Sequence, residues 1–291
     1  KKAMAIKKSQ LFSTLWEGCN QLRGGMEPSQ YKDYVLVILF LKYISDKVKT
    51  DDSFIISVPE GCSFADLVSY KNKPDIGEKI NKVLFQLAKE NDLENIIDNT
   101  DFCDETKLGK GKDLVERLYK LIAVFENPEL DFSHNRAADD DLLGDAYEYL
   151  MREFAAKSGQ TKGQFYTPAE VSRVMAKVIG IGEDTRTRIS IYDPTCGSGS
   201  LLLRAKAEAN TNASVNGQEF ISSTKGLAEM NMILHGVDTA VLHLGDTIND
   251  PQHTEDGISL QTFDYVVANP PFSQKDWLKS AGANDRFGRW G

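Results

Sequence analysis

From about residue 157 onward, short apolar and β-branched runs alternate with helical patterns, and this alternation limits the fold more than any other feature of the chain. Each of these runs is bounded by turn-forming residues and is too short for a helix. Strands that alternate with helices form βαβ units, which pack as a parallel sheet. The predicted strands are Ile189 to Tyr192, Val215 to Glu219, Val241 to Leu244 and Phe263 to Ala268, with helices from about Ser200 to Asn210 and Ser222 to His235.

The first part of the chain has a purely helical pattern. Apolar residues recur at helical spacing in residues 11–22, after Pro28, and in residues 76–87, 114–125 and 142–154. Residues 51–73 give mixed signals, and we expect loops there with one short helix. A Gly/Ser/Lys segment, residues 157–162, is typical of a mobile loop. We therefore expect an all-helical domain in residues 1–156 and an α/β domain in residues 157–291.

A further helix is predicted just before the first strand. Thr167 can be its N-cap, Pro168 its first residue and Glu170 the third position of a capping box. We expect this helix to end near Gly180.

Composition excludes several classes of protein. The longest apolar stretch, Val35 to Leu41, is far shorter than the roughly 20 residues of a membrane-spanning helix, and we expect no secretory signal, because the Lys-rich start is not followed by an apolar segment. The four cysteines are scattered without a Cys-x-x-Cys pair, so we expect free thiols, no zinc site and a cytoplasmic protein. The net charge of −9 repels DNA on average, so a chain that acts on DNA needs either a local basic stripe or a partner to hold it, and the charge favours a partner.

A glycine turn follows the first predicted strand, in the sequence Asp193-Pro-Thr-Cys-Gly-Ser-Gly199. Glycine lets the backbone turn tightly and approach a ligand closely. The turn lacks the third glycine of the dinucleotide fingerprint and the Gly-Lys-Ser/Thr ending of a phosphate loop. Asp193 would repel a pyrophosphate but attract a cationic amino-acid group. A turn that is merely structural is the alternative.

The next two strands also end in polar groups. Glu219 lies about 22 residues beyond Gly197, the spacing at which a carboxylate accepts ribose hydroxyls. The third strand ends before Asp246 and Thr247, and Asp246 could accept a hydrogen bond from an adenine amino group. Since ligands bind beyond the carboxyl ends of parallel strands, these groups predict a nucleoside site. A carboxylate that is merely solvated at the end of its strand is the alternative.

The fourth strand ends in Asn269-Pro270-Pro271-Phe272. The Asn269 side chain and the Pro270 carbonyl offer two acceptors in a stiff turn, and Phe272 offers a face for stacking. Two acceptors can hold both hydrogens of an amine and leave its nitrogen lone pair available for attack. A strand that simply ends in a Pro-Pro turn is the alternative.

These motifs resemble those of a known family. The segments Asp193 to Gly199 and Asn269 to Phe272 resemble the cofactor and catalytic motifs of amino-group DNA methyltransferases of the N6-adenine type, and Gly163-Gln-Phe-Tyr-Thr-Pro168 resembles their motif at the methionine end of S-adenosylmethionine. Leu15-Trp16, Tyr31 to Tyr34, Phe40 to Asp46 and Leu142 to Leu150 resemble the modification subunit of type I restriction–modification systems.

The resemblance implies a Rossmann-like, S-adenosylmethionine-dependent methyltransferase fold that modifies a flipped-out adenine in DNA. The implied partners are DNA, a DNA-specificity subunit, a second methyltransferase subunit and a restriction subunit, with no membrane. The implied catalytic residues are Asn269, Pro270, Pro271 and Phe272. The implied cofactor-binding residues are Gln164, Phe165, Tyr166, Thr167, Pro168, Ala169, Asp193, Gly197, Ser198, Gly199, Ser200, Glu219, Asp246 and Thr247.

One departure from the family concerns the sheet. The family has seven strands, whereas only four are predicted here, so we expect a sheet truncated after its fourth strand. Two alternative functions remain: a methyltransferase that modifies a protein glutamine side chain, and a non-catalytic module that docks partners.

Overall fold

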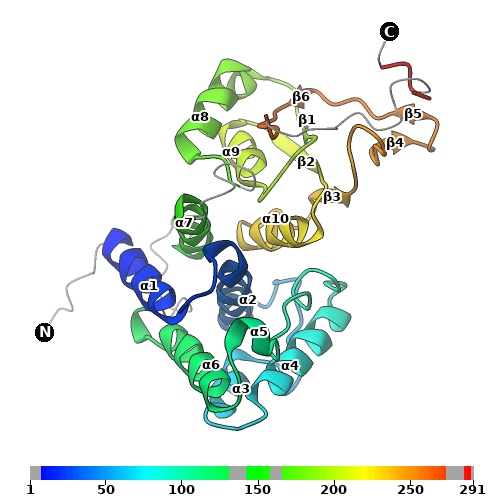
Figure 1. Cartoon of the computed structure of the whole chain (residues 1–291). Helices are drawn as coiled ribbons and strands as arrows, with labels where there is room; N and C mark the ends of the chain where they lie inside the picture. The colour runs from blue at the N-terminus through cyan, green and yellow to red at the C-terminus, as the bar shows by residue number, and fades with distance from the viewer. Residues whose placement is uncertain (1–7, 131–141, 158–165, 273–284, 290–291) are drawn as a thin grey trace, which may run out of the picture. The chain divides into compact units, whose positions relative to one another are not determined.

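The computed structural model describes residues 8–130, 142–157, 166–272 and 285–289. The chain divides into two compact units, Lys1–Gly159 and Gln160–Gly291 (Figure 1). Within the described residues, no helix combines the length and the apolar content needed to cross a lipid bilayer.

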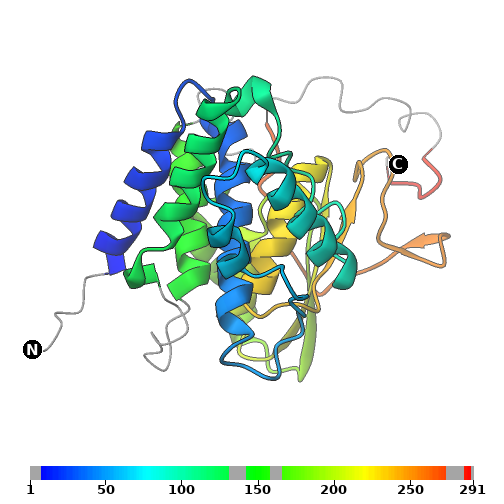
Figure 2. The same cartoon turned by 90° about the horizontal axis from the view of Figure 1, so that it is seen from below.

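The first unit is helical, and helix α2 lies at its centre. Pro28 starts α2, where its missing N–H costs nothing, and every residue from Tyr34 to Leu41 is buried. Helices α3, α6 and α7 pack against it, and Figure 2 shows the long helices side by side. The elements are α1 (Lys8–Leu22), α2 (Pro28–Lys47), α3 (Phe64–Ser69), α4 (Ile76–Glu90), α5 (Glu105–Leu108), α6 (Lys112–Phe125), η1 (Pro128–Leu130) and α7 (Leu142–Lys157).

Aromatic contacts join the helices of this unit. Trp16 of α1 packs edge-on against Phe154 of α7, with ring centroids 5.0 Å apart, and Tyr34 of α2 packs in the same way against Phe102 at 5.2 Å. Such pairs add about 0.5–1.5 kcal/mol beyond their buried area. The short helix expected within residues 51–73 is α3, which has a capping box between Ser63 and Asp66.

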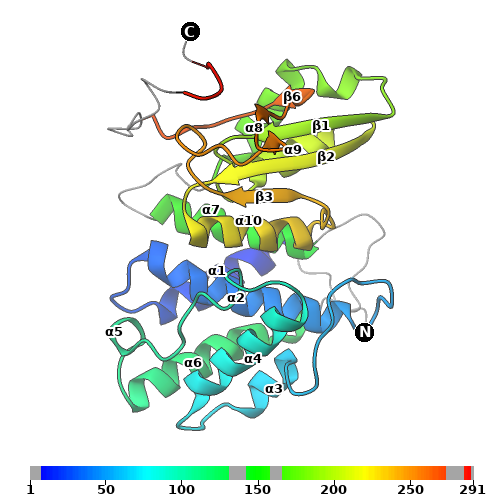
Figure 3. The same cartoon turned by 90° about the vertical axis from the view of Figure 1, so that its right-hand side faces the viewer.

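The second unit contains a four-stranded parallel sheet in the order β3-β2-β1-β6. Figure 3 shows these strands lying next to one another. Ile189, Ile191 and Val215 are buried in the core that the sheet shares with α9. The elements are α8 (Ala169–Val178), η2 (Ile181–Glu183), β1 (Arg188–Asp193), α9 (Ser200–Glu208), β2 (Asn212–Glu219), α10 (Ser222–Leu234), β3 (Val241–Leu244), β4 (Thr254–Glu255), β5 (Ser259–Leu260) and β6 (Tyr265–Val266).

The predicted fold, a helical domain followed by a parallel α/β sheet, is confirmed, but two details of the prediction are wrong. Helix α8 begins at Ala169 with Pro168 as its N-cap, so Thr167 does not cap it. The fourth strand is shorter than predicted, and a β4–β5 hairpin precedes it. The hairpin turn contains Asp256 and Gly257 at positive φ, and the Asp-Gly pair is a signal for such a turn that the sequence carried.

Candidate active site

The glycine turn is held tightly between β1 and β2. The Cys196 amide donates to the Gln218 carbonyl at 3.0 Å, and the Gly199 amide donates to the Cys196 carbonyl at 2.8 Å. Gly197 and Gly199 have φ values of 55° and 77°, in the left-handed region that glycine adopts without strain. At Gly199, an added Cβ would also lie only 2.6 Å from Cε of Met232. The fold therefore requires glycine at position 199, both because of the left-handed backbone conformation and because a larger side chain would collide with Met232.

Asp193 is buried at the tip of β1. Its Oδ1 accepts hydrogen bonds from the Thr195 amide at 2.8 Å and the Thr195 hydroxyl at 3.4 Å. Burial raises the pKa of Asp193 to about 7, although the two hydrogen bonds from Thr195 act in the opposite direction. Within the part of the chain that the structure describes, the hydrogen bonds of Asp193 fall on Oδ1, which leaves Oδ2 for a further donor. A buried carboxylate with a spare oxygen is suited to an ammonium group.

Glu219 ends β2 and is also buried. Its Oε2 accepts from the Gly197 amide at 3.0 Å, and its Oε1 accepts from the Ile221 amide at 2.9 Å. Burial raises the pKa of Glu219, although the backbone donors lower it. The carboxylate thus fixes both the glycine turn and the start of α10. Each oxygen retains a second lone pair that a hydroxyl could reach.

Ser198 and Ser200 lie inside the turn. Their Oγ atoms are 2.9 Å apart, both side chains are buried, and Asn231 of α10 donates from Nδ2 to the Ser198 carbonyl at 3.0 Å. These serine side chains bond to each other, which stabilises the turn. Asn231 was missed by the sequence analysis because nothing in a helical pattern marks such a long-range contact.

The loop after β3 carries Asp246 and Thr247. The Asp246 carboxylate accepts from the Ile248 and Asn249 amides, both at 3.0 Å, which shapes the loop. The Thr247 hydroxyl donates to the Pro194 carbonyl at 2.5 Å. The loop after β3 is therefore hydrogen-bonded to the turn that follows β1. Part of the hydrogen-bonding capacity of the Asp246 carboxylate is already used by backbone amides of its own loop.

Arg289 also binds the loop after β3. It donates from Nη1 to the Thr247 carbonyl at 3.2 Å and from Nη2 to the Ile248 carbonyl at 2.6 Å, and it pairs with Asp285 at 2.9 Å. Sequence reasoning gave Arg289 no role, and no motif marks it.

The tetrapeptide lies at the carboxyl end of β6. The Val267 amide donates to the Tyr192 carbonyl at 2.9 Å, so pairing with β1 continues to within two residues of Asn269. Asn269 is half-buried, Pro270 and Pro271 are exposed, and the Phe272 ring is 90% exposed. An aromatic ring in water is suited to stack on a planar partner.

The segment before α8 meets this tetrapeptide. Asn269 Nδ2 donates a hydrogen bond to the Thr167 hydroxyl at 3.3 Å. Tyr166, the residue before Thr167, is buried. Gln164 and Phe165 lie outside the described residues. Pro168 and Ala169 serve as the N-cap and the first residue of α8. The hydroxyl of Thr167 is thus directed to Asn269 and not to the helix.

Parallel pairing of β1 with β2 and β6, and of β2 with β3, brings the carboxyl ends of the four strands to one edge of the sheet. Asp193, Glu219, the Asp246 loop and Asn269 follow these ends. In the described ranges, no group of His, Cys, Asp and Glu side chains is placed to hold a metal ion.

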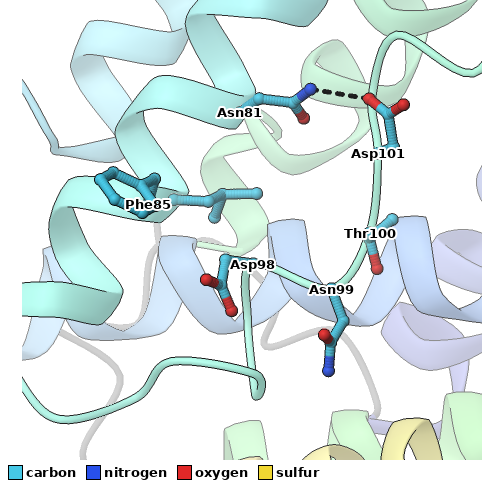
Figure 4. A pocket seen from close by; sticks show the side chains of 7 residues that line it. Asn81, Phe85, Asp98, Asn99, Thr100 and Asp101 are labelled. Carbon is cyan, nitrogen blue, oxygen red and sulfur yellow. Dashed lines mark hydrogen bonds between the residues drawn. The ribbon is translucent and has the colours of Figure 1, made fainter.

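A cavity of about 410 Å³ lies in the helical unit and shares no residue with this edge of the sheet. Figure 4 shows Asn81 and Phe85 of α4 across from the segment that carries Asp98 to Asp101, with Asn81 Nδ2 donating to Asp101 at 2.7 Å. None of the predicted site residues lines it.

Two family models match the chain. Residues 138–290 match the N-6 DNA Methylase family, and residues 11–125 match the HsdM N-terminal domain. The chain belongs to the N-6 DNA methylase family. The resemblance to type I modification subunits, predicted from the sequence, is confirmed.

The curated relatives of this chain include methylase subunits of type I restriction enzymes. It is 28% identical to the MpnII methylase subunit of Mycoplasma pneumoniae, over 89% of this chain and 57% of that protein. It is 24% identical to the EcoKI methylase subunit of Escherichia coli K12, over 96% of this chain and 52% of that protein. The chain thus spans about half the length of these curated relatives.

A solved structure gives the same fold. The methyltransferase subunit of a type I restriction–modification system from Streptococcus thermophilus matches with a TM-score of 0.78 and 30% identity, over 92% of this chain and 64% of that one. A modification subunit of a type I restriction enzyme from Vibrio vulnificus, at 20% identity and a TM-score of 0.55, shares the fold.

Proposed function

We propose that the chain is the catalytic part of a DNA adenine-N6 methyltransferase, a modification subunit that works in a type I restriction–modification complex in the cytoplasm. The observation that carries the proposal is the Asn269 tetrapeptide beside the Asp193 turn, at the carboxyl ends of the neighbouring parallel strands β6 and β1. Its partners would be DNA, a DNA-specificity subunit, a second methyltransferase subunit and a restriction subunit. The net charge of −9 supports a division of labour in which another subunit holds the DNA.

The residues present fit S-adenosylmethionine, which supplies an electrophilic methyl group when it is bound. The buried Asp193 carboxylate, with Oδ2 available, suits the ammonium of the methionine moiety. Glu219 suits the ribose hydroxyls, and the Asp246–Thr247 loop suits the adenine ring. The turn from Gly197 to Ser200 would hold the middle of the cofactor, and residues 164–169 would hold its methionine end.

The chemistry needs a nitrogen nucleophile held in line with the methyl group, so positioning supplies most of the rate. An adenine within a duplex must first be flipped out of the stack. The exposed Phe272 ring then stacks on the base. The Asn269 side-chain oxygen and the Pro270 carbonyl accept the two N6 hydrogens, while the rigid Pro270-Pro271 peptide fixes the second acceptor.

The decisive experiment uses the complete subunit assembled with a DNA-specificity subunit and S-adenosylmethionine labelled in its methyl group. Adenine in DNA should receive the label. Asn269→Ala should abolish transfer while cofactor affinity, measured by calorimetry, stays within about twofold. Asn212→Ala, on the exposed start of β2, is the matched control and should leave transfer unchanged.

Two results would overturn the proposal. Label found in a protein glutamine and not in DNA would identify a protein methyltransferase, which needs a similar arrangement to hold an amide nitrogen. Cofactor binding without transfer to either substrate would identify a module that docks partners.

A further inference from the structure

The side chains of Thr167 and Asn269 meet although 102 residues separate them. Asn269 Nδ2 is the donor, and the Thr167 hydroxyl oxygen is the acceptor, at 3.3 Å. This contact uses the nitrogen of the amide and leaves its oxygen, Oδ1, to face another donor. We propose that Thr167 is a positioning residue that sets which atom of the Asn269 amide faces the target amine. The inference rests on the proposed function and deepens it.

The orientation of the amide matters because its two ends have opposite hydrogen-bonding characters. The oxygen accepts and the NH2 group donates, yet the two ends have nearly the same shape. Rotation about the last side-chain torsion exchanges them, and that torsion has two broad minima. In the wrong orientation the NH2 group of Asn269 would face the NH2 group of the target, with donor against donor. A partner that accepts from Nδ2 removes this orientation.

Thr167 is itself held firmly by its surroundings. Tyr166, the preceding residue, is buried, and Pro168 follows. A residue before proline is kept out of the helical region. The Pro168 carbonyl accepts the Ser172 amide at 3.0 Å, which anchors this point to the first turn of α8. The hydroxyl is therefore not used as a helix cap and lies at a fixed place near the tip of β6.

A hydroxyl also has one proton to donate. While the Thr167 oxygen accepts from Asn269, its own proton is available to an anionic acceptor, such as the carboxylate at the methionine end of the cofactor. A proton used in that way cannot turn toward Asn269 Oδ1. Cofactor binding would thus lock Asn269 in its accepting orientation before the base arrives.

The test measures single-turnover methylation by the complete subunit, assembled with its specificity subunit, at saturating S-adenosylmethionine. Thr167→Val keeps the shape and removes the hydroxyl, whereas Thr167→Ser keeps the hydroxyl. One neutral hydrogen bond corresponds to about a threefold to tenfold change in rate. We expect Thr167→Val to slow transfer by that factor and Thr167→Ser to stay within about twofold of wild type. Thermal unfolding midpoints should match in all three proteins.

A second background separates positioning from other roles. In Asn269→Asp both side-chain oxygens are acceptors, so no wrong orientation exists. Adding Thr167→Val there should change the rate by less than about twofold. An equal loss in both backgrounds, or an unchanged rate for Thr167→Val with only cofactor affinity reduced, would overturn the inference. A wild-type complex that methylates no adenine would instead remove the proposed function.

Discussion

Glu219 Oε2 accepts the backbone amide of Gly197 at 3.0 Å, so the tip of β2 holds the glycine turn that follows β1. The other carboxylate oxygen accepts the Ile221 amide at 2.9 Å, just before α10. A side chain predicted to bind ribose thus also shapes the turn on which the cofactor would rest. Loss of this carboxylate should affect stability as well as affinity.

We expect Glu219→Gln to lower the free energy of unfolding by about 1–3 kcal/mol, nearly as much as Glu219→Ala. The isosteric amide places an NH2 group against one of the two backbone N–H groups, donor against donor. Urea unfolding measures this loss. Glu208→Gln is the matched control, since its ion pairs with Arg173 and Lys177 lie at the surface and contribute about 0–1 kcal/mol. Equal losses at both positions would argue against a structural role for Glu219.

The second prediction concerns pH. Because burial raises the pKa of Asp193 to about 7 from an ordinary 3.8, the fold favours the protonated acid. Its contribution to stability is complete below about pH 4 and is lost as the pH rises to about 7. The loss is roughly 4 kcal/mol at most, from about 1.4 kcal/mol per pKa unit. Unfolding free energies of Asp193→Asn and wild type should therefore diverge between pH 4 and 7 in favour of the variant; parallel curves would refute the prediction.

Gly199 allows a third prediction with an internal control. Gly199 and Gly236 both have positive φ, 77° and 67°, but only at Gly199 would a Cβ meet another atom closely. Gly236→Ala should cost about 1–2 kcal/mol from backbone strain. Gly199→Ala should cost about 1–3 kcal/mol more, because Met232 must move. The two variants are compared by thermal or urea unfolding, and similar costs would show that Met232 moves aside freely.

The fourth prediction concerns Arg289, which donates to the Thr247 and Ile248 carbonyls. Arg289→Lys keeps the charge but loses the forked geometry. It should loosen residues 246–250, speed their amide hydrogen exchange and weaken cofactor binding about threefold to tenfold. Arg286→Ala, which removes an exposed side chain stacked on Phe287, is the control and should change neither. Exchange that stays slow in Arg289→Lys would contradict this assignment.

Local patterns in the sequence were enough to predict much of the fold. Helices α1, α2, α4, α6 and α7 and all four strands of the parallel sheet were predicted, because apolar periodicity and turn residues are local signals. Helix α5 and the β4–β5 hairpin were missed. Helix α5 has four residues and each hairpin strand has two, which is too few for a periodic pattern of apolar residues. The N-cap of α8 was misplaced by one residue because the Thr167 hydroxyl bonds to Asn269.

Local reading of the sequence is enough to identify the chemical groups at or just beyond the end of each strand: Asp193, Glu219, Asp246 and Asn269. It also determined the class of sheet, because alternating strands and helices must connect in parallel. The folded chain was needed to establish the strand order β3-β2-β1-β6. It was also needed for the contacts of Glu219 with Gly197, Asn269 with Thr167 and Arg289 with Thr247. Each of these contacts joins residues from separate strands or loops. The hydrogen-bond partner of a side chain depends on which elements pack beside it, and local periodicity does not specify that packing.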